Sequence, residues 1–285
     1  MQPAPLAPDA LALAKEARLV AWFREKGSAL IGFSGGVDSA YLACVALDAL
    51  DASRVLAVIG RSASYPEAQW TRAREVADRF NVPVLEVDTD EMNDPEYAAN
   101  PTNRCYFCKR ELWGRLAPIA EARGLAVVVD GTNADDLGDH RPGARAARER
   151  EVSSPLAEIG LTKPEIRALS SARGIPSWDQ PSSPCLSSRL PYGTAVTPLR
   201  LRTVEVAEAA LRALGIEGNL RVRYFGEAAK VELDPGPLAY WSEGEARERL
   251  QAAVRSAGFA QVEIDPRGFR SGGLNVLAGI TVGGT

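Results

Sequence analysis

The sequence predicts an α/β fold in which an open parallel sheet is covered by helices and is followed by a smaller α+β domain. Short apolar runs alternate with segments of helical periodicity through the first half of the chain. These runs are almost continuously apolar, which is typical of strands buried on both faces. Near residue 176 the composition changes to a stretch rich in Pro and Ser, and a different order of elements follows it.

The first half contains four predicted strands and the helices that connect them. We expect the strands at 28–33, 55–60, 84–87 and 125–129, and helices at 37–50 and 67–80. Strands that alternate with helices of this length imply right-handed βαβ units, in which the strands run parallel. An N-terminal helix precedes the first strand, and we expect this first domain to span residues 1–175.

The second half begins with a long loop and ends with a small module. Residues 176–197 show no periodicity, and their Trp, Tyr and Leu residues favour an ordered, functional loop. The elements predicted after it are a helix at 198–214, strands at 220–225 and 228–233, a helix at about 243–257 and a strand at 260–265. The small α+β domain is therefore expected at residues 198–285.

Composition and charge exclude several classes of protein. The 285 residues are 46% hydrophobic, and 37 acidic side chains stand against 33 basic ones. A chain of this length buries enough surface to fold without disulfides or a structural metal. The net charge of −4 disfavours a broad nucleic-acid surface. We find neither an apolar run of the roughly 20 residues that a membrane helix needs nor a signal peptide. The sequence thus predicts a cytoplasmic protein without a membrane or nucleic-acid partner.

A glycine-rich turn, SGGVDS at Ser34–Ser39, lies between the first predicted strand and the first long helix. Glycines there allow positive φ and close approach of the backbone, and the helix N-terminus attracts anions. The residues expected to bind a phosphate group are Ser34, Gly35, Gly36, Asp38 and Ser39. A plain turn capped by Asp38 or Ser39 is the alternative. The pattern is neither GxxxxGK[ST] nor GxGxxG, which disfavours P-loop kinases and Rossmann dehydrogenases.

Cysteine positions suggest metal or redox chemistry rather than a disulfide framework. Cys105 and Cys108 form a CxxC motif at the start of a predicted helix, where i and i+3 share one face. Cys185, in the long loop, is a candidate third ligand. Three thiolates leave one position open, as in a reactive metal or iron–sulfur site. A CxxC dithiol and two unremarkable small side chains are the alternatives. Cys44 lies among apolar residues and is expected to pack in the core.

Cys185 is also a candidate nucleophile. It lies in the loop sequence SSPCLSSR, and Arg189 follows four residues later. Basic neighbours favour a thiolate, and a thiolate attacks an activated carboxylate to form a thioester. The nucleophile and metal-ligand hypotheses for Cys185 can be combined or can exclude one another.

SGGVDS resembles the signature loop of the PP-loop ATP pyrophosphatase superfamily, and GTNADD at 131–136 resembles a second turn of these enzymes. The resemblance implies that ATP is split between its α and β phosphates, that a substrate oxygen is adenylylated and that pyrophosphate leaves. Gly131 and Thr132 would then bind ATP, and Asp38 and Asp135 would bind Mg²⁺. Either aspartate is also a reasonable helix cap.

Longer segments resemble one PP-loop family along nearly the whole chain, the LarE-type ATP-dependent sulfur transferases. The segments are DHRPGARAARE, SPLAEIGLTKPEIRALS, PSWDQPSSPCLSSRLPYGTAVT, RVRYFGEAAKVEL and GFAQVEIDPRGFRSGGLN. The resemblance implies that each carboxylate of pyridinium-3,5-biscarboxylic acid mononucleotide is activated with ATP and becomes a thiocarboxylate, for the nickel-pincer nucleotide cofactor. It also implies a homo-oligomer, built through residues 198–285, with nickel-insertion and carboxylase proteins of the same pathway as partners.

The same resemblance implies two sources of sulfur. In sacrificial members the cysteine at the position of Cys185 gives up its own sulfur and becomes dehydroalanine. In other members three cysteines bind a [4Fe-4S] cluster whose unligated iron holds the sulfur to be donated. This chain has Cys105, Cys108 and Cys185 at the matching positions, which favours the cluster-bearing branch.

Arginines of the small domain are candidates for binding an acidic substrate. Arg221 and Arg223 alternate along one predicted strand and therefore share a face, and Glu232 lies on the paired strand. The family resemblance implies that both arginines bind the substrate phosphate. Glu232 is expected either to orient the arginines or to act as an acid or base, and Arg189 is expected to add to a local site for a small anion. A solvated sheet face is the alternative.

Other functions explain fewer of these features. A tRNA-thiolating PP-loop enzyme also combines the loop with cysteines, but the acidic chain contains no recognisable RNA-binding module. A non-catalytic nucleotide or iron–sulfur binding protein is another possibility. NAD and GMP synthetases share an SGGVDS-like loop, yet they do not account for the cysteines.

Overall fold

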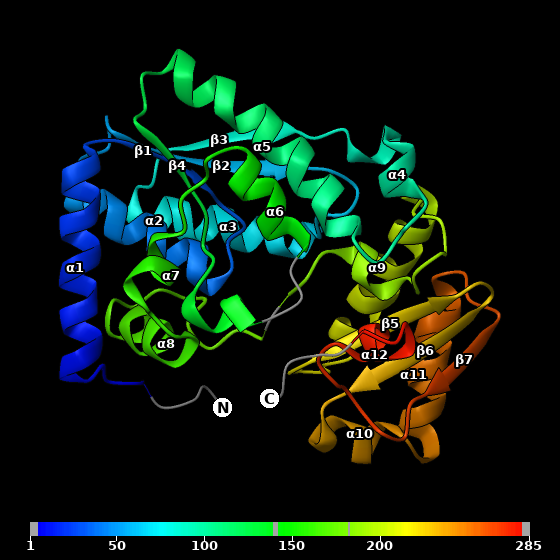
Figure 1. The fold of residues 1–285 in the computed structure, drawn as a ribbon. Helices are drawn as coiled ribbons and strands as arrows, with labels where there is room; N and C mark the ends of the chain where they lie inside the picture. The colour runs from blue at the N-terminus through cyan, green and yellow to red at the C-terminus, as the bar shows by residue number, and fades with distance from the viewer. Residues whose placement is uncertain (1–4, 139–141, 182, 281–285) are drawn as a thin grey trace. The chain divides into compact units, whose positions relative to one another are not determined.

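The computed structural model describes residues 5–138, 142–181 and 183–280. The chain divides into two compact units (Figure 1). The first comprises Met1–Glu91 and Cys105–Ser183, and the second comprises Met92–Arg104 and Pro184–Thr285. The segment Met92–Arg104 thus belongs to the second unit, although the first unit precedes and follows it in the sequence.

The first unit is built on a four-stranded parallel sheet in the order β3-β2-β1-β4. Its strands are β1 (Ala29–Gly32), β2 (Val55–Arg61), β3 (Val84–Asp88) and β4 (Val127–Val129). The predicted open parallel sheet is confirmed. The last strand begins two residues later than expected because the N–H of Leu125 still donates to Ala120 O at the end of the preceding helix.

Helices cover both faces of this sheet (Figure 1). On one face lie α1 (Ala10–Lys26), α2 (Val37–Ala49), α3 (Glu67–Phe80), α7 (Pro155–Ile159) and α8 (Lys163–Ala172). On the other lie α5 (Arg104–Ala122) and α6 (Pro142–Glu149). Ala29 and Ile31 pack in the first core and Leu30 packs in the second, because successive side chains of a strand point to opposite faces.

Two loops leave the carboxyl edge of this sheet beside one another. Strand β1 pairs with β4, with Leu30 opposite Val128, and both strands run in the same direction. The loop after β1 contains Ser34–Ser39, and the loop after β4 leads into the 3₁₀ helix η2 (Ala134–Gly138). Ligands of open α/β sheets bind at this edge. The parallel order therefore brings the two sequence motifs together.

The second unit contains a three-stranded mixed sheet. Strands β5 (Leu220–Phe225) and β6 (Ala228–Leu233) form the predicted hairpin, and Gly226 in its turn has φ +71°. Strand β7 (Gln261–Ile264) runs parallel to β6. The long helices of this unit are α9 (Pro198–Ala213) and α11 (Gly244–Ser256), and both have a buried apolar stripe.

Four short helices of the second unit were not predicted from the sequence. They are α4 (Pro95–Ala98), η3 (Leu186–Arg189), α10 (Pro235–Trp241) and α12 (Gly273–Leu277). Their segments are too short to show a helical period, and two of them begin at a proline. The 3₁₀ helix η1 (Glu91–Asn93) contains the boundary between the two units, which falls after Glu91. Among the described helices, none is long and apolar enough to cross a membrane.

Candidate functional site

The turn between β1 and α2 has the geometry of an anion site. Gly36 is the N-cap of α2 and provides no side-chain hydrogen bond to the first turn, so Asp38 and Ser39 do not act as caps there. Gly35 has φ +70°, and a Cβ added to it would lie 2.5 Å from the Cβ of Ala73. Only glycine can adopt this positive φ without strain and also leave room for the Ala73 side chain. The N-cap of α2 provides no side chain to its first N–H groups, and such a helix start suits an anion.

Neighbouring side chains hold the turn in place. The Tyr65 hydroxyl and Gln69 Nε2 each donate to the carbonyl oxygen of Ser34 at 2.9 Å. The Ser39 hydroxyl accepts from the N–H of Ser34 at 3.2 Å and donates to Gly36 O. The loop is thus held by its own hydroxyl groups and by two side chains, one just before α3 and one within it.

The turn after β4 lies directly against the phosphate loop. A Cβ on Gly131 would come within 3.0 Å of the Ser39 nitrogen and 3.2 Å of the Asp38 Cβ. Asn133 Nδ2 lies 3.4 Å from Asp38 Oδ1. The Thr132 hydroxyl donates to Asp130 Oδ2, so this side chain also stabilises its own turn. Both motifs that the sequence assigns to ATP are therefore in contact within the first unit.

Lys163 is a site residue that the sequence analysis missed. It is the first residue of α8, and its ammonium lies 2.5 Å from Asp38 Oδ2. The Asp135 carboxylate accepts the backbone N–H of Lys163 at 2.6 Å, which is the helix-cap role left open above. The capping-box pattern Thr162–Glu165 predicts the start of this helix but not the distant partner of its lysine. A cation and a carboxylate thus meet beside the phosphate loop.

In the second unit, Cys185 stands at the start of η3 and is half-buried. Its backbone oxygen accepts from Arg189 Nη1 at 3.1 Å. Arg189 also forms two hydrogen bonds with the Glu208 carboxylate, at 2.9 and 2.8 Å. The guanidinium of Arg189 therefore organises the backbone around Cys185.

Segment Met92–Arg104 supports the same loop. Arg104 Nη1 donates to Ser187 O at 3.0 Å, and the Tyr97 and Ser187 hydroxyls lie 2.7 Å apart. Asn100 Nδ2 donates to the backbone oxygens of Pro191 and Thr194. The residues just before the CxxC motif, NPTNR, thus stabilise the Cys185 loop within the second unit, and the sequence pattern did not predict this contact.

Arg221 and Arg223 are buried, with 5% of each residue exposed, so they do not form a solvated sheet face. Arg223 donates to Glu232 Oε2 at 2.7 Å and to Ser188 O at 2.9 Å. Arg221 lies over the ring of Phe269. Burial, together with the nearby charges of Arg189 and Arg223, lowers the pKa of Arg221 to about 10. The protonated guanidinium is therefore costly to the fold at every pH below this value.

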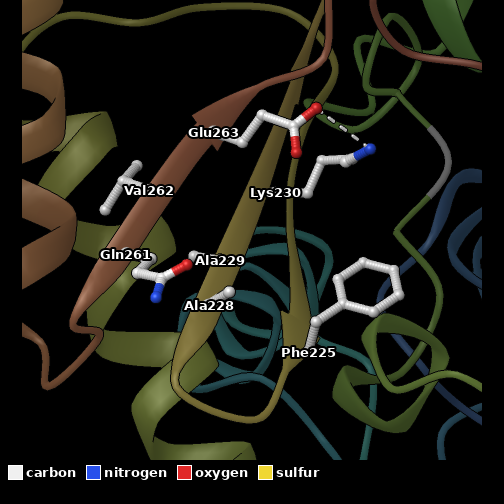
Figure 2. A pocket seen from close by; sticks show the side chains of 7 residues that line it. All are labelled: Phe225, Ala228, Ala229, Lys230, Gln261, Val262 and Glu263. Atoms are coloured by element: carbon white, nitrogen blue, oxygen red, sulfur yellow. Dashed lines mark ion pairs between the residues drawn. The ribbon is translucent and has the colours of Figure 1, made fainter.

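A pocket of about 360 Å³ lies on the same sheet face as the arginines, near the hairpin turn (Figure 2). Its lining includes Phe225, Lys230 and Glu263. Lys230 is paired with Glu263 at 3.1 Å, so the pocket lacks the cationic character that a phosphate requires. The pocket is therefore a poorer match to an acidic substrate than Arg221 and Arg223, which remain the predicted phosphate-binding residues.

Replacing Arg221 with methionine is expected to weaken binding of an acidic substrate without destabilising the fold. Removing a guanidinium with a lowered pKa should leave the free energy of unfolding unchanged or raise it by about 1 kcal/mol. Thermal unfolding and substrate titration measure the two effects separately. Replacing the exposed Arg202 of α9 with methionine is the control. A destabilised Arg221 variant with unchanged substrate affinity would contradict the expectation.

The CxxC thiols are accessible on the first turn of α5, where Cys105 is exposed and Cys108 is half-buried. Helix α6 approaches this turn closely, since a Cβ on Gly143 would lie 3.4 Å from Cys105 O. Within the described ranges no group of three or more His, Cys, Asp or Glu side chains is arranged to hold a metal ion. Cys44 is buried in the first core, and burial raises the pKa of its thiol to about 12.

Comparison with known proteins identifies the family. Residues 21–104 match the family model of NAD synthase. An uncharacterised protein of Synechocystis is 43% identical over 89% of this chain and 94% of its own. The pyridinium-3,5-bisthiocarboxylic acid mononucleotide synthase of Lactiplantibacillus plantarum is 33% identical over 92% of this chain and 94% of its own. The chain belongs to the LarE-type PP-loop sulfur transferases. The resemblance read from the sequence motifs is confirmed.

As a LarE-type protein, the chain is an ATP-using enzyme, and the NAD synthase match covers its phosphate loop. The tRNA-specific 2-thiouridylase of Chlorobium phaeovibrioides is also similar, at 24% identity over 56% of this chain and 53% of its own. The similarity to this thiouridylase covers about half of the chain, whereas the similarity to the Lactiplantibacillus synthase extends over nearly all of it.

Proposed function

We propose that this LarE-type enzyme adenylylates the carboxylates of pyridinium-3,5-biscarboxylic acid mononucleotide and converts them to thiocarboxylates. The similarity to the Lactiplantibacillus synthase over more than nine-tenths of both chains is the observation that carries this proposal. The chemistry of each unit supports it. One unit contains a glycine turn at a helix N-terminus, and the other contains buried arginines and a half-buried cysteine.

In the first step the N–H groups at the start of α2 hold the phosphates of ATP. Asp38 and Asp135 are the candidates for Mg²⁺, because hard carboxylate oxygens suit this ion. Each also has a protein partner, the Lys163 ammonium for Asp38 and the Lys163 N–H for Asp135. Bound Mg²⁺ would neutralise phosphate charge. Lys163, which pairs with Asp38, supplies a second positive charge at the same place. The substrate carboxylate attacks the α-phosphorus, the bond to the bridging oxygen breaks, and pyrophosphate leaves.

The arginines of the second unit bind the substrate phosphate. Arg221 and Arg223 present planar guanidinium groups, which match phosphate geometry. Glu232 holds Arg223 through two hydrogen bonds and limits its orientations. The phosphate of the substrate mononucleotide is remote from the carboxylate that reacts. Binding this phosphate positions the carboxylate and requires no contact with the pyrophosphate that leaves.

In the second step of the sacrificial route the Cys185 thiolate attacks the acyl-adenylate, and AMP leaves. In the sacrificial route a base removes the Cα proton of Cys185, its Cβ–S bond breaks, and thiocarboxylate and dehydroalanine are the products. In the cluster route Cys105, Cys108 and Cys185 would hold a [4Fe-4S] cluster, which would supply the sulfur. The first two thiols lie at positions i and i+3 near the start of α5. Because the sacrificial route needs only Cys185, the CxxC pair favours the cluster.

The double variant Cys105→Ser, Cys108→Ser is expected to lose the brown chromophore of anaerobically prepared enzyme and to lose multiple turnover. Iron and sulfide analysis and the absorption spectrum measure the cluster. Cys44→Ala, which removes a buried core thiol, is the control and should keep the chromophore. If the double variant retains one turnover per chain and Cys185 becomes dehydroalanine by mass spectrometry, the sacrificial route is correct and the cluster proposal fails.

The function itself is tested by pyrophosphate release. Purified enzyme with ATP and Mg²⁺ should release pyrophosphate only when the pyridinium dicarboxylate mononucleotide is present, and mass spectrometry should find the thiocarboxylate. Unfractionated tRNA is the competing acceptor. Pyrophosphate release that requires tRNA would replace the proposal with the tRNA-thiolase alternative, and no release with either acceptor would support a non-catalytic binding protein.

A further inference from the structure

Helix α1 is attached to the segment that carries Lys163. Figure 1 shows α1 beside α7 and α8. The Lys15 ammonium donates to Gly160 O at 2.7 Å and to both oxygens of the Glu165 carboxylate at 2.7 and 2.8 Å. Trp22 Nε1 donates to Glu158 Oε2. Lys15 thus bridges the turn before α8 and the first turn of that helix.

Glu165 is the residue through which Lys15 acts on α8. It occupies the third position of the helix, and its Oε2 accepts from the N–H of Thr162 at 2.8 Å and from the Thr162 hydroxyl at 2.9 Å. Burial works against the charged form, but the hydrogen bonds from Lys15 and Thr162 prevail and lower the pKa of Glu165. The ionised carboxylate closes the capping box and determines where α8 begins.

Lys163 lies between these two capping residues. Its backbone N–H is held by Asp135, and its ammonium reaches Asp38 of the phosphate loop. Each of these bonds depends on the position of the first turn of α8. A chain of contacts therefore runs from Lys15 through Glu165 and the helix start to Lys163 and Asp38.

We propose that Lys15 is a positioning residue of the nucleotide site: by holding Glu165 it fixes the first turn of α8 and so the place at which Lys163 meets Asp38 and the ATP phosphates. This inference rests on the proposed role of Lys163. It gives the N-terminal helix, most of which lies outside the NAD synthase match, a part in ATP binding.

Docking of α1 does not itself depend on Lys15. Leu19 and Phe23 are fully buried in the core of the first unit, and Arg173 holds Glu16 at 2.7 Å. Loss of the Lys15 ammonium should therefore leave the helix in place while Glu165 loses its cation. A variant at Lys15 therefore tests whether Lys15 positions α8, because it should change MgATP binding without unfolding the protein.

The test is calorimetric titration of the full-length enzyme with MgATP, without an acceptor. Lys15→Met should weaken binding about tenfold with little change in the thermal unfolding temperature, and Lys15→Arg should restore most of the affinity. Arg24→Met, which removes an exposed cation from the same helix, is the matched control and should bind as the wild type does. Equal affinities of Lys15→Met and Arg24→Met would overturn the inference.

A double-mutant cycle with Lys163→Ala identifies the path of the effect. If Lys15 acts through Lys163, adding Lys15→Met to Lys163→Ala should weaken MgATP binding no further. Fully additive losses would show that Lys15 acts elsewhere and would contradict the inference. Failure of the wild-type enzyme to bind MgATP would instead contradict the proposed nucleotide site, so the two failures are distinguishable.

Discussion

Replacing Cys185 with alanine is expected to abolish formation of the thiocarboxylate, because both sulfur routes require this thiol. The contacts around it use the backbone oxygen of Cys185, which Arg189 holds, and alanine retains that oxygen. The variant should therefore fold normally and should still release pyrophosphate when ATP and the substrate are supplied. Mass spectrometry of the product and a pyrophosphate assay on the same sample measure the two steps separately.

The control for this prediction is Cys44→Ala, which removes a thiol from the core without touching the loop. Cys185→Ser gives a second check, since a hydroxyl group has nearly the same size but cannot deliver sulfur. Thiocarboxylate formed at the wild-type rate by either Cys185 variant would exclude Cys185 from the chemistry and would contradict both routes.

Replacing Lys163 with alanine is expected to lower substrate-dependent pyrophosphate release by about a hundredfold, because positive charge beside the transferring phosphates is a large part of such catalysis. The backbone bond from residue 163 to Asp135 survives in the variant, so the start of α8 should persist. Asp38, with 21% of its side chain exposed, remains hydrated when its partner is removed. Steady-state kinetics with varied ATP measure the loss.

Lys163→Arg keeps the charge and should retain more activity than the alanine variant does. Arg74→Ala, which breaks an exposed ion pair on α3, is a control of the same charge type and should leave the rate unchanged. A Lys163→Ala enzyme with the rate and KM for ATP of the wild type would show that the ion pair with Asp38 is structural only.

Local patterns were sufficient for the elements that the sequence predicted well. The strands at 220–225 and 228–233 have the predicted bounds because apolar alternation and a glycine turn both specify the hairpin. The phosphate loop was recognisable because its turn needs a positive backbone φ, which glycine adopts without strain. Gly35 has such a positive φ. Such signals are contained within a few neighbouring residues.

The roles of charged residues required the tertiary structure. The sequence offered both Mg²⁺ binding and a helix cap for Asp135, and only the structure shows that its carboxylate accepts the Lys163 N–H. Arg221 and Arg223 alternate as on any exposed strand, and only the segments packed over them make them buried. Contacts between residues so far apart in sequence leave no periodic signal.

The sequence by itself determined the parallel sheet, the phosphate loop, the family and three cysteines of interest. Only the tertiary structure decided that Lys163 meets Asp38, that α1 is tied to α8 and that Met92–Arg104 belongs with the Cys185 loop. The physical reason is the range of the interactions. Turn geometry and hydrophobic periodicity act between neighbours along the chain, whereas ion pairs and buried hydrogen bonds depend on which distant segments the folded core brings together.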